Sequence, residues 1–252
     1  MLASVLQVTP NGPWGKDVHP RMPVLLDELI SDLSACFDAG ADGVHLHVRD
    51  HAGAETLDPA VVNLTCRRVR EVAEDAGHVV EVGLTTGAWI VPDLNDRIAM
   101  IGEWEGVDCA TVNLSEAGFE RVMSAMVDAG IGIDVGLWAP QEIDVLIRSG
   151  FLPQAQRISI ELDSGEPYFL RGDPRTVAQQ INETLDQAGS ACPRLTHGMN
   201  AWTWPLVEDA FSRGHHTRVG FEDSVFLPDG ERAHSNADLV AAAVTLRAQI
   251  AR

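Results

Sequence analysis

Short apolar runs alternate along this chain with longer segments in which apolar residues recur every three or four positions, and turn residues separate the two. A short apolar run bounded by turn residues is typical of a buried strand, and the longer spacing is typical of an amphipathic helix. The alternation predicts eight strand–helix units. We expect strands at residues 4–8, 43–48, 79–84, 109–113, 131–137, 157–162, 194–196 and 217–221, and helices at 24–39, 59–76, 93–102, 116–129, 140–149, 174–188, 201–213 and 236–250.

Strands that are separated by helices pair in parallel, and eight such units close more naturally into a barrel than into an open sheet. The length of 252 residues matches the usual size of a (β/α)8 TIM barrel, and no change in composition marks a linker. We therefore expect one α/β domain over residues 1–252. A doubly wound sheet is the alternative, but no Gly-x-Gly-x-x-Gly motif follows any predicted strand.

The chain carries 37 acidic and 18 basic side chains, which give it a formal net charge of -19. This charge opposes binding to nucleic acid or to an anionic membrane, so an anionic ligand would need a local cluster of cations. Residues 1–9 lack the basic start and long apolar core of a secretory signal, and no apolar run approaches the length of a membrane helix. These features predict a cytoplasmic enzyme.

Lysine and cysteine usage narrows the chemistry further. Lys16 is the only lysine, so no lysine on a central strand is available for Schiff-base catalysis. Carbon–carbon bond chemistry, if this chain performs it, would have to depend on a metal ion. The four cysteines are scattered without a Cys-x-x-Cys pair, which predicts reduced and mostly buried thiols.

Two histidines at alternate positions, His45 and His47, stand near the end of the second predicted strand. Because side chains alternate across a strand, both imidazoles point to the same face and can bind one metal ion. The pair favours metal ligation over a core role, but a catalytic site also needs a third ligand and an open coordination position. A second pair, His215 and His216, precedes the eighth strand at the opposite end of the barrel and is expected on the surface.

The carboxyl ends of the strands form the functional face of a barrel of this kind. Glu222 is the strongest candidate for a third ligand, because it follows the eighth strand and can reach across the barrel mouth to the second. Two histidines and one carboxylate leave coordination positions open for substrate oxygens. The other polar residues expected at the strand ends are Asn11, Thr85, Thr86, Asn113, Ser115, Asp134, Trp138, Glu161, His197 and Asp223.

Residues beside these candidate ligands suit separate chemical roles. The guanidinium of Arg218 suits a carboxylate or an enolate oxygen, and Asp223, which would point away from the third ligand, can serve as a general base. Thr85 and Thr86 offer hydroxyl donors, and Gly87 permits a close approach to the backbone.

Several of these residues also have a purely structural interpretation. Glu222 can cap the loop after the last strand, and Arg218 and Asp223 can simply pair with each other. Glu161 and His197 fit either a substrate pocket or a hydrogen-bonded core network.

The segments around these candidates resemble the β-keto acid cleavage enzymes. Residues 39–50, AGADGVHLHVRD, contain the His-x-His pair, and residues 214–224, GHHTRVGFEDS, contain the arginine and the two carboxylates. Residues 236–240, NADLV, add a further likeness. These segments lie near both ends of the chain in the order that the family shows.

The resemblance implies a zinc-dependent barrel enzyme that transfers an acyl group between a β-keto acid and acetyl-CoA, giving acetoacetate and a new acyl-CoA by a retro-Claisen route. It implies zinc ligation by His45, His47 and Glu222, with Asp223 and Arg218 promoting attack and cleavage. It also implies a homo-oligomer, a tetramer in the family. The substrate-binding residues that we predict are Thr85, Thr86, Gly87, Ala88, Asn11, Thr111 and Asn113.

The departures from the family pattern concern the substrate more than the chemistry. Ala88 stands where the family has the second glycine of its Ser/Thr-Thr-Gly-Gly stretch, and residues 113–117, NLSEA, replace its Gly-Ser-x-Asn-Phe segment. Two other functions stay open. One is a metal hydrolase of the amidohydrolase kind, although its histidine pair belongs on the first strand, and the other is a non-catalytic barrel that binds a metabolite or a structural zinc.

Overall fold

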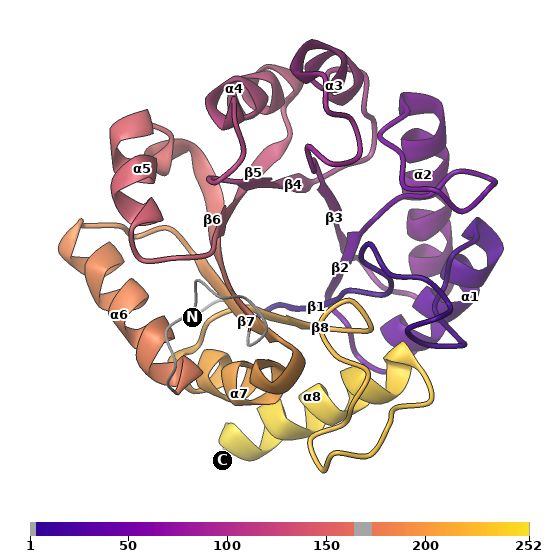
Figure 1. Ribbon diagram of the computed structural model, residues 1–252. Helices are drawn as coiled ribbons and strands as arrows, with labels where there is room; N and C mark the ends of the chain where they lie inside the picture. The colour runs from indigo at the N-terminus through magenta and orange to yellow at the C-terminus, as the bar shows by residue number, and fades with distance from the viewer. Residues whose placement is uncertain (1–3, 164–172, 252) are drawn as a thin grey trace.

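A ring of eight strands is surrounded by eight α-helices in the computed structural model, which describes residues 4–163 and 173–251 (Figure 1). The strands are β1 (Leu6–Val8), β2 (Gly43–Leu46), β3 (Glu81–Thr85), β4 (Cys109–Asn113), β5 (Gly132–Leu137), β6 (Ala155–Asp163), β7 (Arg194–Met199) and β8 (Thr217–Val219). The helices are α1 (Leu26–Asp38), α2 (Pro59–Asp75), α3 (Leu94–Ile101), α4 (Phe119–Ala129), α5 (Glu142–Ser149), α6 (Pro174–Gln187), α7 (Thr203–Arg213) and α8 (Asn236–Ile250). Strands and helices alternate as the hydrophobic pattern predicts.

The strands form one parallel sheet in the order β7-β6-β5-β4-β3-β2-β1-β8. Backbone hydrogen bonds from Thr196 N to His216 O and from His216 N to Arg194 O, both 2.9 Å, join β7 to the start of β8. These bonds close the sheet into a ring, which confirms the (β/α)8 barrel and excludes the open doubly wound sheet. Because β1 pairs with both β2 and β8, β8 lies two strands from β2, on the same side of the barrel.

Local capping signals set the starts of α2 and α8. The Asp58 carboxylate accepts hydrogen bonds from the first turn of α2, and Pro59 occupies the first helical position. Ser235 and Asp238 form a capping box at the start of α8. Because such caps are visible in the sequence, the predicted starts of these two helices agree with the structure.

The strands direct apolar side chains towards the helices and polar side chains into the interior of the barrel. Side chains such as Val44 and Leu46 alternate with the inward-facing histidines and pack in the layer between strands and helices, fully buried. The interior holds an ion-pair network instead of an aliphatic layer. Arg157 donates from Nε to Asp134 Oδ2 (2.8 Å) and from Nη1 to Glu81 Oε1 (2.6 Å). Asp134, expected at the strand exit, is therefore a buried interior residue whose carboxylate is neutralised by an arginine.

The observed bounds differ from the predicted ones by up to three residues, both at strand ends and at helix starts. β2 ends at Leu46, so His47 lies just beyond the strand. β7 extends to Met199, three residues past its predicted end, and continues into a short 3₁₀ helix, η2 (Asn200–Trp202). A second 3₁₀ helix, η1 (Leu152–Gln154), was not expected. Helices this short carry no periodic signal of their own.

The expectation that His215 and His216 lie on the surface is wrong, because both are half-buried. His216 Nδ1 accepts a hydrogen bond from Val5 N (2.8 Å), and the His215 ring lies 3.3 Å from Thr196 Oγ1. Burial lowers the pKa of both imidazoles, that of His215 to about 4. These residues help to close the barrel where β7 meets β8.

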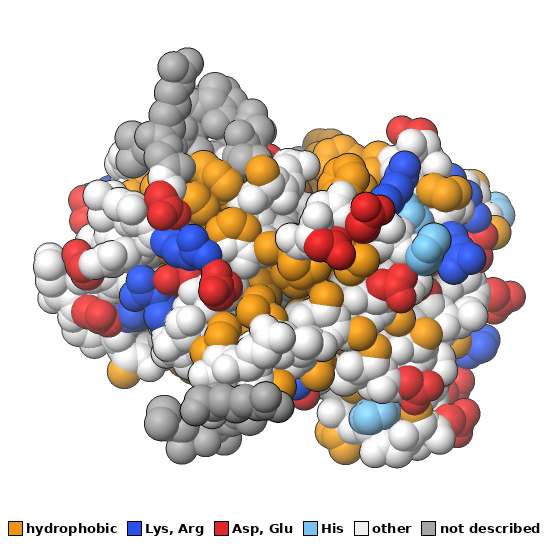
Figure 2. Space-filling model, turned by 90° about the horizontal axis from the view of Figure 1, so that it is seen from below, with side chains coloured by type: hydrophobic (Ala, Val, Ile, Leu, Met, Phe, Trp, Pro, Cys, Tyr) orange, Lys and Arg blue, Asp and Glu red, His pale blue; other side chains and the backbone are white. Residues whose placement is uncertain are grey.

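The outer surface is mixed in character. Figure 2, seen from the side of α7 and α8, shows apolar side chains gathered across the middle of this face, with acidic and basic groups on either side. Within the described part of the chain, no helix is long and apolar enough to cross a membrane.

Candidate metal centre and active site

His45, His47 and Glu222 meet at the mouth of the barrel. One ligand-type atom from each residue lies within 4.8 Å of the corresponding atoms of the other two, and all three side chains are buried. The two imidazoles come from the end of β2, and the carboxylate comes from the loop after β8. The strand order explains this meeting, because β1 separates β2, which carries the histidines, from β8, which precedes Glu222.

The loop after β8 is held against β1 by close backbone packing. Glu222 N donates to Thr9 O (3.2 Å), and a Cβ on Gly220 would lie only 2.1 Å from the same oxygen. Thr9 also donates from Oγ1 to Asp223 Oδ2 (2.7 Å). Gly220 is therefore required for the approach that places both carboxylates.

The three groups fit a divalent metal ion by their chemistry. Two imidazoles and one carboxylate form a donor set typical of catalytic zinc sites. Burial lowers the pKa of His45 well below its usual value, which favours the neutral ring that ligates metals. Glu222 Oε2 is buried without a hydrogen-bond partner among the described residues, so this oxygen is available to bind a cation.

A carboxylate that was not predicted lies behind His47. The Nδ1 atom of His47 is 2.7 Å from Glu55 Oε1, and its Nε2 atom faces Glu222 Oε1 at 3.7 Å. Glu55 follows the histidine by eight residues in the loop after β2, which is too far for a strand pattern to reveal. Trp89 donates from Nε1 to the same carboxylate and stacks on the His47 ring.

Arg218 links the candidate ligand Glu222 to Asp223. Its Nη2 donates to Glu222 Oε1 and to Asp223 Oδ1, both at 2.9 Å, and its Nε donates to His197 Nδ1 at 3.1 Å. Arg218 and Asp223 thus form the ion pair that the structural interpretation of the sequence predicts. The pairing does not remove Arg218 from the site, because its side chain also lines the cavity beside the metal ligands.

Asp223 is fully buried and ionised. Burial opposes its charge, but the Arg218 cation, the contact with His197 and the Thr9 hydroxyl prevail and lower the pKa of the carboxyl to about 2. His197 and Glu161 extend this network, with His197 Nε2 at 3.6 Å from Glu161 Oε1. Of the two, Glu161 lines the cavity, whereas His197 lies behind Arg218 and Asp223.

The cavity at the metal centre has a volume of about 110 Å³. Thr85, Thr111 and Asn113, three of the residues predicted to bind substrate, line it. Trp138 also lines it and donates from Nε1 to Asn113 Oδ1 (3.1 Å). Further lining side chains that sequence reasoning did not assign to substrate are Pro13, Trp89 and Met199.

Four other predicted substrate residues do not line this cavity but support its walls. Asn11 bonds to the backbone of His47 through both side-chain atoms, with its Nδ2 3.0 Å from His47 O. Thr86 Oγ1 donates to Thr111 O in β4 (2.8 Å), and Ala88 N donates to Glu116 Oε2 (2.9 Å). The space above Gly87 is filled by the Trp89 indole and is not open to a ligand.

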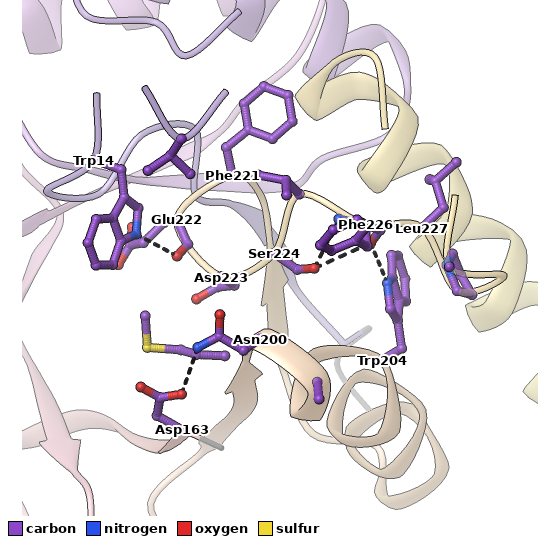
Figure 3. A pocket seen from close by; sticks show the side chains of 16 residues that line it. Trp14, Asp163, Asn200, Trp204, Phe221, Glu222, Asp223, Ser224, Phe226 and Leu227 are labelled. Atoms are coloured by element: carbon purple, nitrogen blue, oxygen red, sulfur yellow. Dashed lines mark hydrogen bonds between the residues drawn. The ribbon is translucent and has the colours of Figure 1, made fainter. Parts of the chain in front are cut away.

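A larger cavity of about 580 Å³ lies beside the metal centre (Figure 3). Glu222 and Met199 line both cavities, so the two adjoin at the carboxylate of the candidate metal centre. Trp14 borders the larger cavity and donates from Nε1 to Glu222 O (3.0 Å), and across it Trp204 Nε1 donates to Phe226 O (2.7 Å). The walls are mainly apolar, which suits a ligand that is largely uncharged.

Asn200 marks the rim of this larger cavity. It is the one residue other than glycine with a positive φ angle, +57°, in the described chain. Its backbone N donates to Asp223 O (2.7 Å), and its side chain donates to Asp163 Oδ1 (2.8 Å). These bonds compensate the left-handed conformation and tie η2 to the loop that carries Asp223.

The fold and the site together define a (β/α)8 barrel with a candidate His–His–Glu metal centre and an adjoining arginine–aspartate pair. The chain belongs to the beta-keto acid cleavage enzyme family, whose model matches residues 4–252. Two relatives are named 3-keto-5-aminohexanoate cleavage enzyme. One, from Acetoanaerobium sticklandii, is 24% identical, and the other, from Fusobacterium nucleatum subsp. nucleatum, is 26% identical; each match covers 94% of this chain and 88% of the relative.

Solved structures support the fold. The apo structure of ObcA superimposes with a TM-score of 0.68 at 15% identity, covering 90% of this chain and 61% of that chain. The structure of 3-hexulose-6-phosphate synthase from Salmonella typhimurium gives a TM-score of 0.54 at 14% identity, covering 97% of this chain and 99% of that one. The family assignment agrees with the resemblance found in the sequence.

Proposed function

We propose that this protein is a zinc-dependent acyltransferase that cleaves a β-keto acid with acetyl-CoA as co-substrate, giving acetoacetate and a new acyl-CoA. The observation that carries the proposal is the convergence of His45, His47 and Glu222 beside the Arg218–Asp223 pair. Membership of the beta-keto acid cleavage enzyme family supports the choice of substrate class.

The residues of the site divide the work of binding and proton transfer. A metal held by His45, His47 and Glu222 would polarise the keto group of the substrate. Arg218 stabilises negative charge that develops on substrate oxygens, and Asp223 is the proposed proton acceptor.

Polar groups of the small cavity orient the β-keto acid. Thr85, Thr111 and Asn113 offer hydroxyl and amide groups from the ends of β3 and β4. The remaining predicted residues, Asn11, Thr86, Gly87 and Ala88, act by supporting these walls.

The proposed retro-Claisen route conserves every atom of the two substrates. Asp223 takes a proton from C2 of the β-keto acid, C2 bonds to the acetyl carbonyl carbon, and the CoA thiolate leaves. The thiolate then adds to the original keto carbon, C3, and the C2–C3 bond breaks with its electron pair on C2, which recovers the proton. Acetoacetate therefore contains C1 and C2 of the β-keto acid together with the acetyl group.

The larger cavity has room for the second substrate. Its volume of about 580 Å³ and its mainly apolar walls suit the uncharged arm of a CoA thioester, and it adjoins the smaller cavity at Glu222. The formal charge of -19 gives the nucleotide phosphates little general attraction to the protein. We therefore propose that the arm contributes more binding energy than the nucleotide.

Incubation of the metal-loaded protein with a panel of β-keto acids and acetyl-CoA tests the proposal. Mass spectrometry is expected to detect acetoacetate and a new thioester in equal amounts. Hydrolysis without consumption of acetyl-CoA would favour the hydrolase, and absence of any turnover would favour the metabolite-binding barrel. The variant His45→Ala is expected to lose bound zinc, and undiminished zinc would refute the ligand set.

The family resemblance also supports a proposal for the oligomeric state, the cellular location and the partners of the protein. We infer a homo-tetramer that acts on small molecules in the cytoplasm and binds neither nucleic acid nor membranes. The acidic charge of the chain supports the exclusion of these anionic partners.

A further inference from the structure

A continuous set of contacts leads from the loop after β3 to the metal ligand His47. Trp89 Nε1 donates to the Glu55 carboxylate, at 3.2 Å from Oε2, and Glu55 Oε1 lies 2.7 Å from His47 Nδ1. The indole also stacks on the imidazole with the ring centres 6.1 Å apart. The carboxylate therefore contacts both members of a stacked ring pair at once.

The indole reaches this position because residue 87 is a glycine. A Cβ at Gly87 would lie 2.4–2.6 Å from three atoms of the Trp89 ring, which is closer than any side chain permits. Trp89 is half exposed and lines the small cavity, so its ring forms a wall between the ligand space and Glu55. The glycine, the tryptophan and the carboxylate thus form one packed unit.

Glu55 is itself held by a compact turn that follows the His-x-His strand directly. Its backbone pairs with Arg49 across this turn, and the Asp50 carboxylate accepts hydrogen bonds from Ala52 N and Ala54 N inside it. Arg49 also ties the turn to Gly12 O (2.8 Å) in the loop after β1. The carboxylate is consequently presented to the imidazole from a fixed backbone.

We propose that Glu55 is a positioning residue that sets the orientation and tautomer of His47. A carboxylate at Nδ1 accepts the ring proton there, which leaves the Nε2 lone pair directed to the metal centre, where Glu222 Oε1 lies at 3.7 Å. Trp89 holds the same carboxylate from its other side and shields the bond from solvent. The inference rests on the proposed metal site, and it adds the residue that prepares one of its ligands.

Direct metal titration tests the inference without reference to activity. We compare the dissociation constants for Zn²⁺ and Co²⁺ in the wild type, Glu55→Ala, Glu55→Gln and the exposed control Glu103→Gln. Glu55→Ala is expected to weaken binding about 10- to 100-fold, because loss of a carboxylate partner typically has this effect. Glu55→Gln is expected to lose less metal affinity, since its amide oxygen still accepts a hydrogen bond from Nδ1. The control should match the wild type.

The tautomer of His47 provides a second readout that a loss of general stability would not produce. Long-range ¹H–¹⁵N spectra of the metal-free protein are expected to show the proton on Nδ1 in the wild type and a mixture of tautomers in Glu55→Ala. Trp89→Phe keeps the ring stack and is expected to retain metal affinity within about threefold, as for a bond between partly exposed groups. Gly87→Ala displaces the indole and is expected to enlarge the apparent KM for the β-keto acid.

Each outcome separates this inference from the proposed reaction. Wild-type metal affinity together with an unchanged tautomer in Glu55→Ala would overturn the inference, even if the protein produces acyl-CoA. Failure of the wild type to bind a divalent metal would overturn it as well. Weakened metal binding in Glu55→Ala supports the inference, and absence of thioester formation by the metal-loaded wild type would refute only the proposed reaction.

Discussion

A single guanidinium, that of Arg218, organises both carboxylates of the site. It shares one nitrogen between Glu222 and Asp223, and its charge offsets part of the cost of burying two neighbouring carboxylates. Burial still raises the pKa of Glu222, whereas the pKa of Asp223 is lowered to about 2. Removal of one partner from such a network leaves an uncompensated buried charge, which is costly. Substitutions here therefore need to preserve shape while changing charge or proton affinity.

The substitution Asp223→Asn tests the role of this carboxylate. The amide keeps the size and part of the hydrogen bonding but cannot accept a proton, so kcat is expected to fall about 10²- to 10⁴-fold. Zinc content should stay at the wild-type level, because Asp223 is not among the proposed ligands. Steady-state kinetics together with metal analysis check this expectation, and retention of wild-type kcat would refute the assignment of the base.

At the residue scale, the sequence predicts side chains that stand in a short pattern and misses those that reach the site from loops. His45, His47 and Glu222 are found because strand alternation and strand order place them together. Glu55 and Trp89 lie in connections, where neither periodicity nor capping indicates their direction. Asp134 is misplaced because the sequence does not show that Arg157 occupies the neighbouring strand at the same level.

The short strand β8 and the loop after it are the elements on which the candidate site depends most. The loop lies close to the backbone of β1, and its two carboxylates face the metal centre and the larger cavity. A change in this contact would move both carboxylates together. The contact point is a glycine without a positive φ angle, so its role is close packing and not turn formation.

Gly220→Ala tests this contact. A methyl group only 2.1 Å from Thr9 O must push the loop away, and overpacking of this kind typically costs about 1–3 kcal/mol in the free energy of unfolding. Zinc affinity is expected to fall as well, because Glu222 moves with the loop. Denaturant unfolding and metal titration measure the two effects. Gly102→Ala is the control, because Gly102 also lacks a positive φ angle and its added Cβ would approach no described atom closer than 3.5 Å.

The connection between α7 and β8 provides a pH-dependent contribution to stability. Burial, assisted by Arg194 and Arg213, lowers the pKa of His215 from 6.5 to about 4, so the folded state disfavours the protonated ring. The unfolded chain binds this proton near pH 6.5. Stability from this group is therefore complete above about pH 6.5, is lost as the pH falls towards 4, and changes little below that value.

Comparison of the wild type with His215→Asn measures this contribution. Asparagine preserves a polar atom near the position of Nδ1 but does not titrate in this range. Between pH 6.5 and 4, the free energy of unfolding is therefore expected to fall by about 2 kcal/mol less in the variant than in the wild type. Urea unfolding at several pH values gives the difference, and His51→Asn on the exposed loop after β2 serves as the control. Parallel pH profiles for the wild type and His215→Asn would contradict the assignment.

At the scale of the whole molecule, the hydrophobic pattern predicts the barrel because each strand and helix presents its own local signal. Strand order follows from parallel pairing, and the position of the site follows from strand order. The cavities do not follow in this way. The larger one depends on the extension of β7, the left-handed Asn200 and the path of residues 224–230, which are set by tertiary contacts that the linear sequence does not display.

The fate of the β-keto acid carbons tests the proposed acyl transfer most directly. The metal-loaded protein is incubated with acetyl-CoA and a β-keto acid that carries ¹³C at C1 and C2, and the products are resolved by mass spectrometry. Both labelled carbons are expected in acetoacetate, with none in the new acyl-CoA, because the C2–C3 bond is the one that breaks. Label in the acyl-CoA, or labelled acetate without consumption of acetyl-CoA, would contradict the account.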